Sequence, residues 1–98
     1  MIRESRIVAT QGKLTVAGEY IKAERLKNKM SREELARKMQ EHGMPMKREL
    51  IFRIENGQRM VSLEEASILC AVLNIDGKGL LDYVLEQIEQ NCYLTANG

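Results

Sequence analysis

The chain has 98 residues, which is enough for one domain with a small hydrophobic core that needs no disulfide or metal to hold it together. Hydrophobic residues make up 44% and aromatic residues only 4%, so we expect an aliphatic core, which favours helices over a β-sheet. The net charge is only +1, but residues 1–60 carry 14 Lys and Arg against 8 Asp and Glu, whereas residues 61–98 carry one Lys against 6 acidic groups.

The first 13 residues show no helical period, and three interpretations of them stay open. They form a disordered tail, a strand or arm that packs on a partner subunit, or a basic arm in which Arg3 and Arg6 touch nucleic acid.

The uneven distribution of charge between residues 1–60 and residues 61–98 has two interpretations. It fits a module that meets phosphates with its basic part, although a chance imbalance on a solvated surface would look the same.

A first helix is expected over residues 16–29, with Thr15 as its N-cap. Val16, Tyr20 and Ala23 follow helical spacing and should face the core. The charged residues between them, Arg25 included, are expected to face solvent.

Residues 31–57 predict two helices joined by a tight connection. Ser31 and Glu34 have the spacing of a capping box, and Gly43 is placed to end the first of the two helices. Pro45 can open the second helix, where its missing N–H costs nothing. That helix has an apolar back and a basic, polar front, a combination that suits the DNA major groove. The back consists of Met46, Leu50, Ile51 and Ile54, and the front of Lys47, Arg48, Glu49 and Arg53.

Two more helices are expected after the loop at residues 58–61. Ser62 and Glu65 have the spacing of a second capping box, and the helix they start carries a broad apolar face. This face consists of Leu63, Ala66, Leu69, Cys70, Val72 and Leu73. Residues 80–90 predict a fifth helix, followed by a frayed tail. Its apolar stripe at i, i+4 and i+7 either joins two chains into a homodimer or belongs to the core of one chain. The stripe consists of Leu81, Leu85 and Ile88.

Several of these segments together resemble the helix-turn-helix of the lambda-repressor-like, or Xre-type, family of bacterial and phage regulators. The resemblance rests on SREELA at residues 31–36, Ile51, RIENG at residues 53–57 and the Ser-Leu-Glu of residues 62–64, and it covers about residues 16–85. It implies an all-α, five-helix domain. The connection at residues 40–45 is longer than usual, as in one subgroup of the family. Arg32 replaces the usual glutamine, and Leu50 and Phe52 occupy positions that are usually polar or small.

The resemblance implies sequence-specific binding of double-stranded DNA by a homodimeric transcription regulator. Arg48, in the first turn of the recognition helix, and Arg53 match base-reading positions, and arginine offers two donors that fit O6 and N7 of guanine. Lys47 and Glu49 flank Arg48. Glu49 either accepts a hydrogen bond from a cytosine amino group or pairs with Arg53 at i, i+4.

Phosphate contacts are expected at two further places. Arg32 lies at a helix N-terminus, where backbone N–H groups also point toward an anion. Asn56, Gln58 and Arg59 match family positions near the DNA backbone.

A protein-interaction module, such as an antitoxin or adaptor, is the alternative interpretation, and Leu50 and Phe52 motivate it. An exposed apolar patch around these two residues would favour a protein partner. A basic front with exposed Arg48 and Arg53 would favour DNA.

The sequence supports no enzyme, metal site, cofactor or small-molecule effector. His42 is the only histidine, and no glycine-rich phosphate loop is present. No stretch resembles a signal peptide or reaches the roughly 18 apolar residues of a membrane span, so we expect a cytoplasmic protein. We expect an N-terminal tail or arm at residues 1–14, the helix-turn-helix domain at 15–92 and a C-terminal tail at 93–98.

Overall fold

The computed structural model describes the backbone of residues 14–97 and the side chains of residues 14–90. The interpretations of residues 1–13 lie outside this range. Residues 14–97 form five helices and no strand, so the expected all-α fold is confirmed. The helices are α2 (Gly18–Lys27), α3 (Arg32–Glu41), α4 (Arg48–Glu55), α5 (Leu63–Leu73) and α6 (Gly77–Asn97). None of them is both long enough and apolar enough to cross a membrane.

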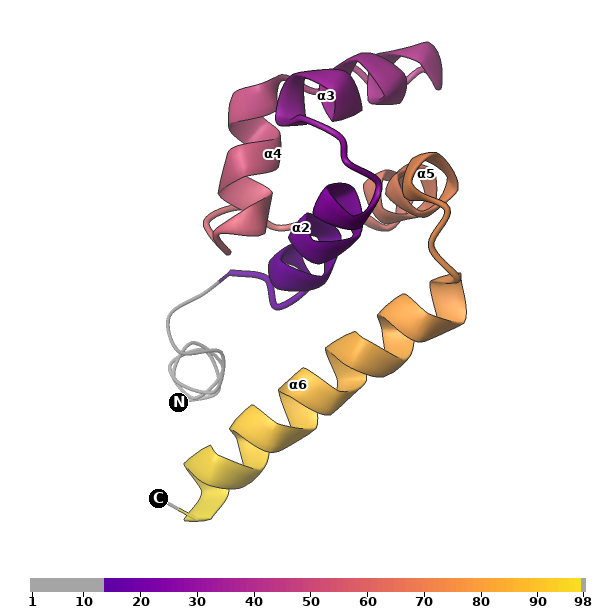
Figure 1. Cartoon of the computed structure of the whole chain (residues 1–98). Helices are drawn as coiled ribbons and strands as arrows, with labels where there is room; N and C mark the ends of the chain where they lie inside the picture. Colours follow the sequence, from indigo (N-terminus) through magenta and orange to yellow (C-terminus); the bar gives the residue numbers. More distant parts are fainter. Residues whose placement is uncertain (1–13, 98) are drawn as a thin grey trace.

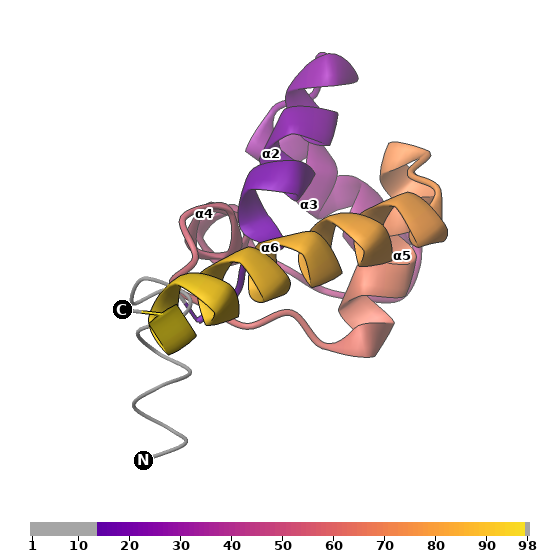
Figure 2. The ribbon, with the colours of Figure 1, turned by 90° about the horizontal axis from the view of Figure 1, so that it is seen from below.

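Four short helices surround a common core, and α6 lies beneath them. Helix α2 packs against α4 and α5, and α3 packs against the same two helices. Figure 1 shows α6 as a long rod below the others, and Figure 2 shows it crossing their lower face. The buried apolar side chains are all aliphatic, as expected: Ala17, Ile21, Met30, Leu35, Met39, Met46, Ile51, Ile54, Leu69, Leu73, Ile75 and Leu80.

Helix α2 begins later than predicted, and its core face is only partly the predicted one: Tyr20 packs against the core as expected. Its N-cap is Ala17, and the Thr15 hydroxyl instead accepts a hydrogen bond from the Ala17 N–H at 3.2 Å. The face with Ala17 and Ile21 is buried, whereas Ala23 is exposed. Gly18 explains this choice, because a Cβ atom there would lie 2.0 Å from the carbonyl oxygen of Ile54. The close approach of α2 to the end of α4 therefore requires glycine at this position.

The ends of α3 largely follow the prediction. The Ser31 hydroxyl accepts from the Glu34 N–H at 3.0 Å, although the reciprocal half of the capping box does not form. Gly43 has a φ of +83°, and its N–H donates to the Gln40 carbonyl at 2.9 Å. This left-handed residue ends the helix in the way a glycine cap does.

Helix α4 begins later than expected. Pro45 does not open it, since the helix starts at Arg48 and Lys47 is its N-cap in an extended conformation. Met46 lies in the irregular segment before it and is buried in the core. Arg48 therefore lies in the first turn of α4, as predicted.

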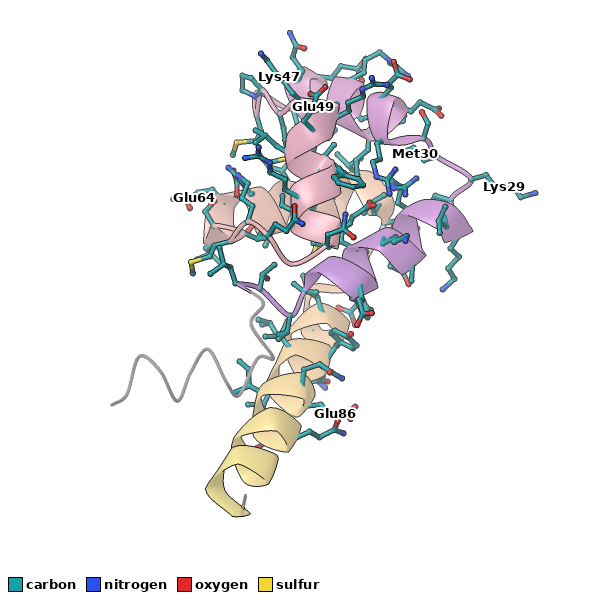
Figure 3. The ribbon with its side chains drawn as sticks, turned by 90° about the vertical axis from the view of Figure 1, so that its left-hand side faces the viewer. Lys29, Met30, Lys47, Glu49, Glu64 and Glu86 are labelled. Atoms are coloured by element: carbon teal, nitrogen blue, oxygen red, sulfur yellow. The ribbon has the colours of Figure 1, made fainter. Side chains whose placement is uncertain are left out.

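Helices α5 and α6 each differ from the prediction, α5 in one residue of its apolar face and α6 in its bounds. Ser62 and Glu65 form both halves of their capping box, but Leu63, expected on the apolar face of α5, is 78% exposed. Helix α6 begins at Gly77 rather than at residue 80 and continues to Asn97, past the expected end at residue 90. In Figures 1 and 3 its C-terminal half runs away from the other four helices.

Candidate nucleic-acid interface

Helix α4 lies on the face turned to the viewer in Figure 3, with Lys47 and Glu49 at its upper end. A shallow hollow of about 600 Å³ lies between this helix and the start of α3. It brings together five of the eight residues that the sequence assigned to DNA binding: Arg32, Arg48, Glu49, Arg53 and Gln58. Lys47 is exposed at the N-cap of α4, just before them.

Arg48 extends from the start of α4 into solvent and is only loosely paired. Its Nη1 lies 3.6 Å from Oε1 of Glu33, and its Nε lies 3.5 Å from Oε1 of Glu49. The Arg48 side chain is 60% exposed, and exposed pairs of this kind stabilise by about 1 kcal/mol or less. The guanidinium can therefore exchange these partners for a base at little cost.

Glu49 pairs with Arg48, and the i, i+4 pair with Arg53, one of the two alternatives for Glu49, does not form. The pKa of Glu49 is lowered, first by a hydrogen bond with its own backbone N–H and then by Arg48. Arg53 is exposed and makes no ion pair or side-chain hydrogen bond with residues 14–90. Its guanidinium is thus open to a ligand in the hollow.

Arg32 is more constrained than a freely exposed arginine. Its Nε donates to Oε1 of Glu55 at 2.9 Å, and its guanidinium lies over the Phe52 ring, 5.1 Å from the ring centre. The side chain is still 32% exposed, and neither Nη atom has a hydrogen-bond partner among the described residues. These two nitrogens remain open for a phosphate.

The Glu55 carboxylate also accepts hydrogen bonds from a second arginine, Arg25, and the sequence did not predict this contact. Arg25, expected to face solvent, is only 5% exposed and donates to Glu55 through both Nε, at 2.6 Å, and Nη2, at 3.2 Å. The signal was present in the sequence: Arg25 lies four residues after Ile21, and Glu55 lies four residues after Ile51. Each therefore occupies a position on the buried face of its helix.

The loop after α4 holds its predicted phosphate-binding residues in different ways. Asn56 caps α4, with its Nδ2 donating to the Phe52 carbonyl at 2.8 Å, and it borders the surface of α2 rather than the hollow. Arg59 forms a two-pronged ion pair with Glu65, at 3.0 and 2.8 Å. This hydrogen-bonded pair lowers the pKa of Glu65 and raises that of Arg59. Phosphate binding by Arg59 stays a prediction, and it requires Arg59 to share or leave this pair.

The apolar residues of α6 divide between two faces of the helix. Leu80 is buried in the core, and Tyr83 packs on Tyr20 of α2 with ring centres 5.1 Å apart. The predicted dimer residues point elsewhere and stay exposed: Leu81 is 67%, Leu85 is 54% and Ile88 is 42% exposed.

Comparison with protein families gives one match. The sequence profile of a family described as Helix-turn-helix matches residues 21–80, a segment that runs from α2 to the start of α6 and covers more than half of the chain. Comparison with curated proteins and with solved structures gives no match. The matched domain is a DNA-binding regulatory domain and does not define a family of enzymes. The chain therefore belongs to the lambda-repressor-like, Xre-type helix-turn-helix family of DNA-binding transcription regulators.

Proposed function

We propose that this protein binds a specific sequence of double-stranded DNA as a homodimer and thereby regulates transcription. The observation that carries the proposal is the exposure of Arg48 and Arg53 on the side of α4 that faces away from the core. A helix of this size fits the major groove, and each arginine can donate two hydrogen bonds to O6 and N7 of a guanine.

The placement of the apolar residues on α4 supports DNA over a protein partner. Leu50, one of the two residues that motivated the alternative, is half-buried and packs against the core. Phe52 alone is exposed, and Arg32 covers one side of its ring. The described part of this face thus lacks the apolar patch that a protein-binding module would need.

Phosphate contacts would hold α4 in its register along the groove. The open Nη atoms of Arg32 lie at the start of α3, where the first backbone N–H groups of the helix also favour an anion. Gln58 is exposed in the hollow, Lys47 is exposed just before it at the N-cap of α4, and Asn56 is exposed on the side next to α2. In this arrangement Arg48 and Arg53 read bases, while the surrounding residues position the protein.

The exposed stripe of α6 supports a homodimer. Three large apolar side chains lie at i, i+4 and i+7 on a helix of 21 residues, the geometry with which two helices pack. A two-fold dimer presents two copies of α4, so its DNA site should be an imperfect palindrome with half-sites roughly 34 Å apart.

A selection of bound duplexes from a random pool tests the proposal. We expect enrichment of one palindromic sequence, and the logarithm of its affinity should fall linearly with the logarithm of the salt concentration. Binding without any enriched sequence, or an affinity that does not respond to salt, would rule out this mode of recognition.

A further inference from the structure

Phe52 stands apart from its neighbours on the candidate DNA-binding face. It lies one helical turn after Arg48, and the residue is 47% exposed among charged and polar side chains that line the same hollow. Leu50 and Ile51 beside it in the sequence turn toward the core. Within residues 14–90, the Arg32 guanidinium covers one side of this ring, and the remaining apolar surface is left exposed on the face that would meet DNA.

The ring is also held in place from the interior of the protein. The Arg32 guanidinium lies over it, and the Arg32 Nε donates to Glu55, whose side chain is only 1% exposed. Arg25, also buried, fixes the same carboxylate with two hydrogen bonds. A chain of contacts from the buried ion pair to the surface therefore orients the ring before any ligand arrives, which lowers the entropy cost of a contact.

The major groove offers such a ring one matching group. Guanine, adenine and cytosine present hydrogen-bond donors and acceptors at their edges, whereas thymine also presents its C5-methyl group. A phenyl ring placed against a purely polar edge would leave donors or acceptors without partners, which costs free energy. Against a methyl group it removes two apolar surfaces from water.

We propose that Phe52 is a specificity-determining residue that contacts the C5-methyl group of a thymine next to the base read by Arg48. This inference rests on the proposed DNA-binding function and adds to it a preference for thymine at one position of each half-site. A cytosine methylated at C5 presents the same group, so a synthetic DNA pool without methylated cytosine assigns any such preference to thymine.

Replacing thymine with uracil removes only this methyl group and leaves base pairing unchanged. In the selected duplex, we expect uracil at one position of a half-site to weaken binding by the wild-type protein about fourfold, the effect of one buried methylene-sized group. Uracil in both half-sites should weaken it roughly 15-fold if the two contacts are independent.

Three variants connect the methyl group to the ring. Phe52→Ala should bind thymine and uracil duplexes equally, while Phe52→Leu, which keeps an apolar side chain, should retain part of the difference. Arg48→Ala serves as the matched control: it should bind more weakly but keep the full thymine-to-uracil ratio. Because Phe52 is about half exposed, thermal unfolding should show that its variants remain folded.

The outcomes separate this inference from the function on which it rests. If one sequence is selected but no uracil substitution weakens wild-type binding, the thymine contact is wrong and sequence-specific DNA binding stands. The same conclusion follows if Phe52→Ala keeps the wild-type sensitivity to uracil, because another residue then reads the methyl group. If no sequence is selected at all, both the proposed function and this inference fail. The uracil scan of the wild-type protein needs no variant, so a variant that fails to fold does not leave the question open.

Discussion

Nε of Arg25 donates to Oε2 of Glu55 across 2.6 Å, and this buried ion pair joins α2 to the last turn of α4. Nη1 of Arg25 also donates to the Met30 carbonyl at 2.7 Å, and none of the buried side-chain polar atoms in the described residues lacks a partner. The same carboxylate accepts from Arg32 at the edge of the hollow. The Glu55 carboxylate therefore joins α4 to both α2 and α3.

Removing one partner of this pair should be costly. Glu55→Gln leaves Arg25 buried without a counter-charge, and we expect the free energy of unfolding to fall by about 3–5 kcal/mol. Denaturant titration measures it. As a control, Arg37→Ala breaks an exposed ion pair with Glu41 and should cost about 1 kcal/mol or less. Equal losses in the two variants would show that the buried pair does not hold the helices together.

Lys29 offers a stabilising substitution. It follows α2 with a φ of +54°, a left-handed conformation that costs a residue with a side chain about 1–2 kcal/mol relative to glycine. Its side chain points into solvent (Figure 3). After the entropy cost of glycine is subtracted, Lys29→Gly should raise the free energy of unfolding by about 0.5–1 kcal/mol.

The matched control for this substitution is Lys22→Gly, which places glycine in the interior of α2 at another exposed lysine. It should destabilise the protein by about 1 kcal/mol. Thermal unfolding should therefore shift in opposite directions for the two variants, and a shift to lower temperature in both would contradict the strain assigned to Lys29.

Acid should weaken the junction between the loop after α4 and the start of α5. The pKa of Glu65 is held below its ordinary value of 4.5, first by the hydrogen bonds from Arg59 and also by the Ser62 N–H. Because the folded-state pKa is the lower one, the stabilisation is complete above the unfolded-state pKa and is lost as the pH falls through the folded-state pKa.

Denaturant titrations at about pH 7 and about pH 4 test this linkage. Glu65→Gln should be less stable than the wild type at the higher pH and lose less stability on acidification. Glu64→Gln, at the exposed neighbouring position, should behave like the wild type. If Glu65→Gln loses as much stability in acid as the wild type, other carboxylates determine the acid response.

The exposed stripe on α6 predicts a homodimer, and one charged substitution within the stripe should dissociate it. Leu85→Asp would place an unpaired carboxylate between two chains, at a cost of several kcal/mol, and sedimentation should then show a monomer with unchanged helical signal. Leu63→Asp, at an exposed leucine of α5, should leave the dimer intact. A wild-type protein that is already monomeric at tens of micromolar would disprove a dimer through α6.

Local signals in the sequence predicted most of the fold, because they depend on short-range hydrogen bonds. Ser31, Gly43 and Ser62 act at the helix ends where their chemistry placed them. The position of Pro45 before α4 could not be predicted in this way, since the segment around it is irregular and packs through the buried Met46, a tertiary contact that local signals do not show. The register of α2 likewise depends on a contact between Gly18 and Ile54, which are distant in the sequence.

The residues of the candidate site divide in the same way into those that local signals predict and those whose role depends on contacts with distant residues. The exposure of Arg48 and Arg53 could be predicted because it follows from the periodicity of a short helix, whereas their assignment to base-reading positions came from the family resemblance. The role of Arg25 was missed because a charged residue is normally assigned to solvent, and only its distant partner Glu55 makes its burial favourable. The pairing of Arg59 with Glu65 depends on how the loop folds back toward α5, which the residue types alone do not determine.

The ratio of affinities for the selected duplex and for a scrambled duplex, measured for the wild type and for Arg48→Ala, tests base reading by α4 most directly. Arg48→Ala should lose about 1–3 kcal/mol of binding free energy per half-site on the selected duplex and little on the scrambled one, so the ratio of the two affinities should fall toward one. Arg53→Ala should act in the same way at a different base position. Arg37→Ala, which removes an exposed arginine of α3 outside the hollow, should leave the ratio unchanged. Equal weakening of both duplexes by Arg48→Ala would contradict the account, because Arg48 would then contact only the DNA backbone.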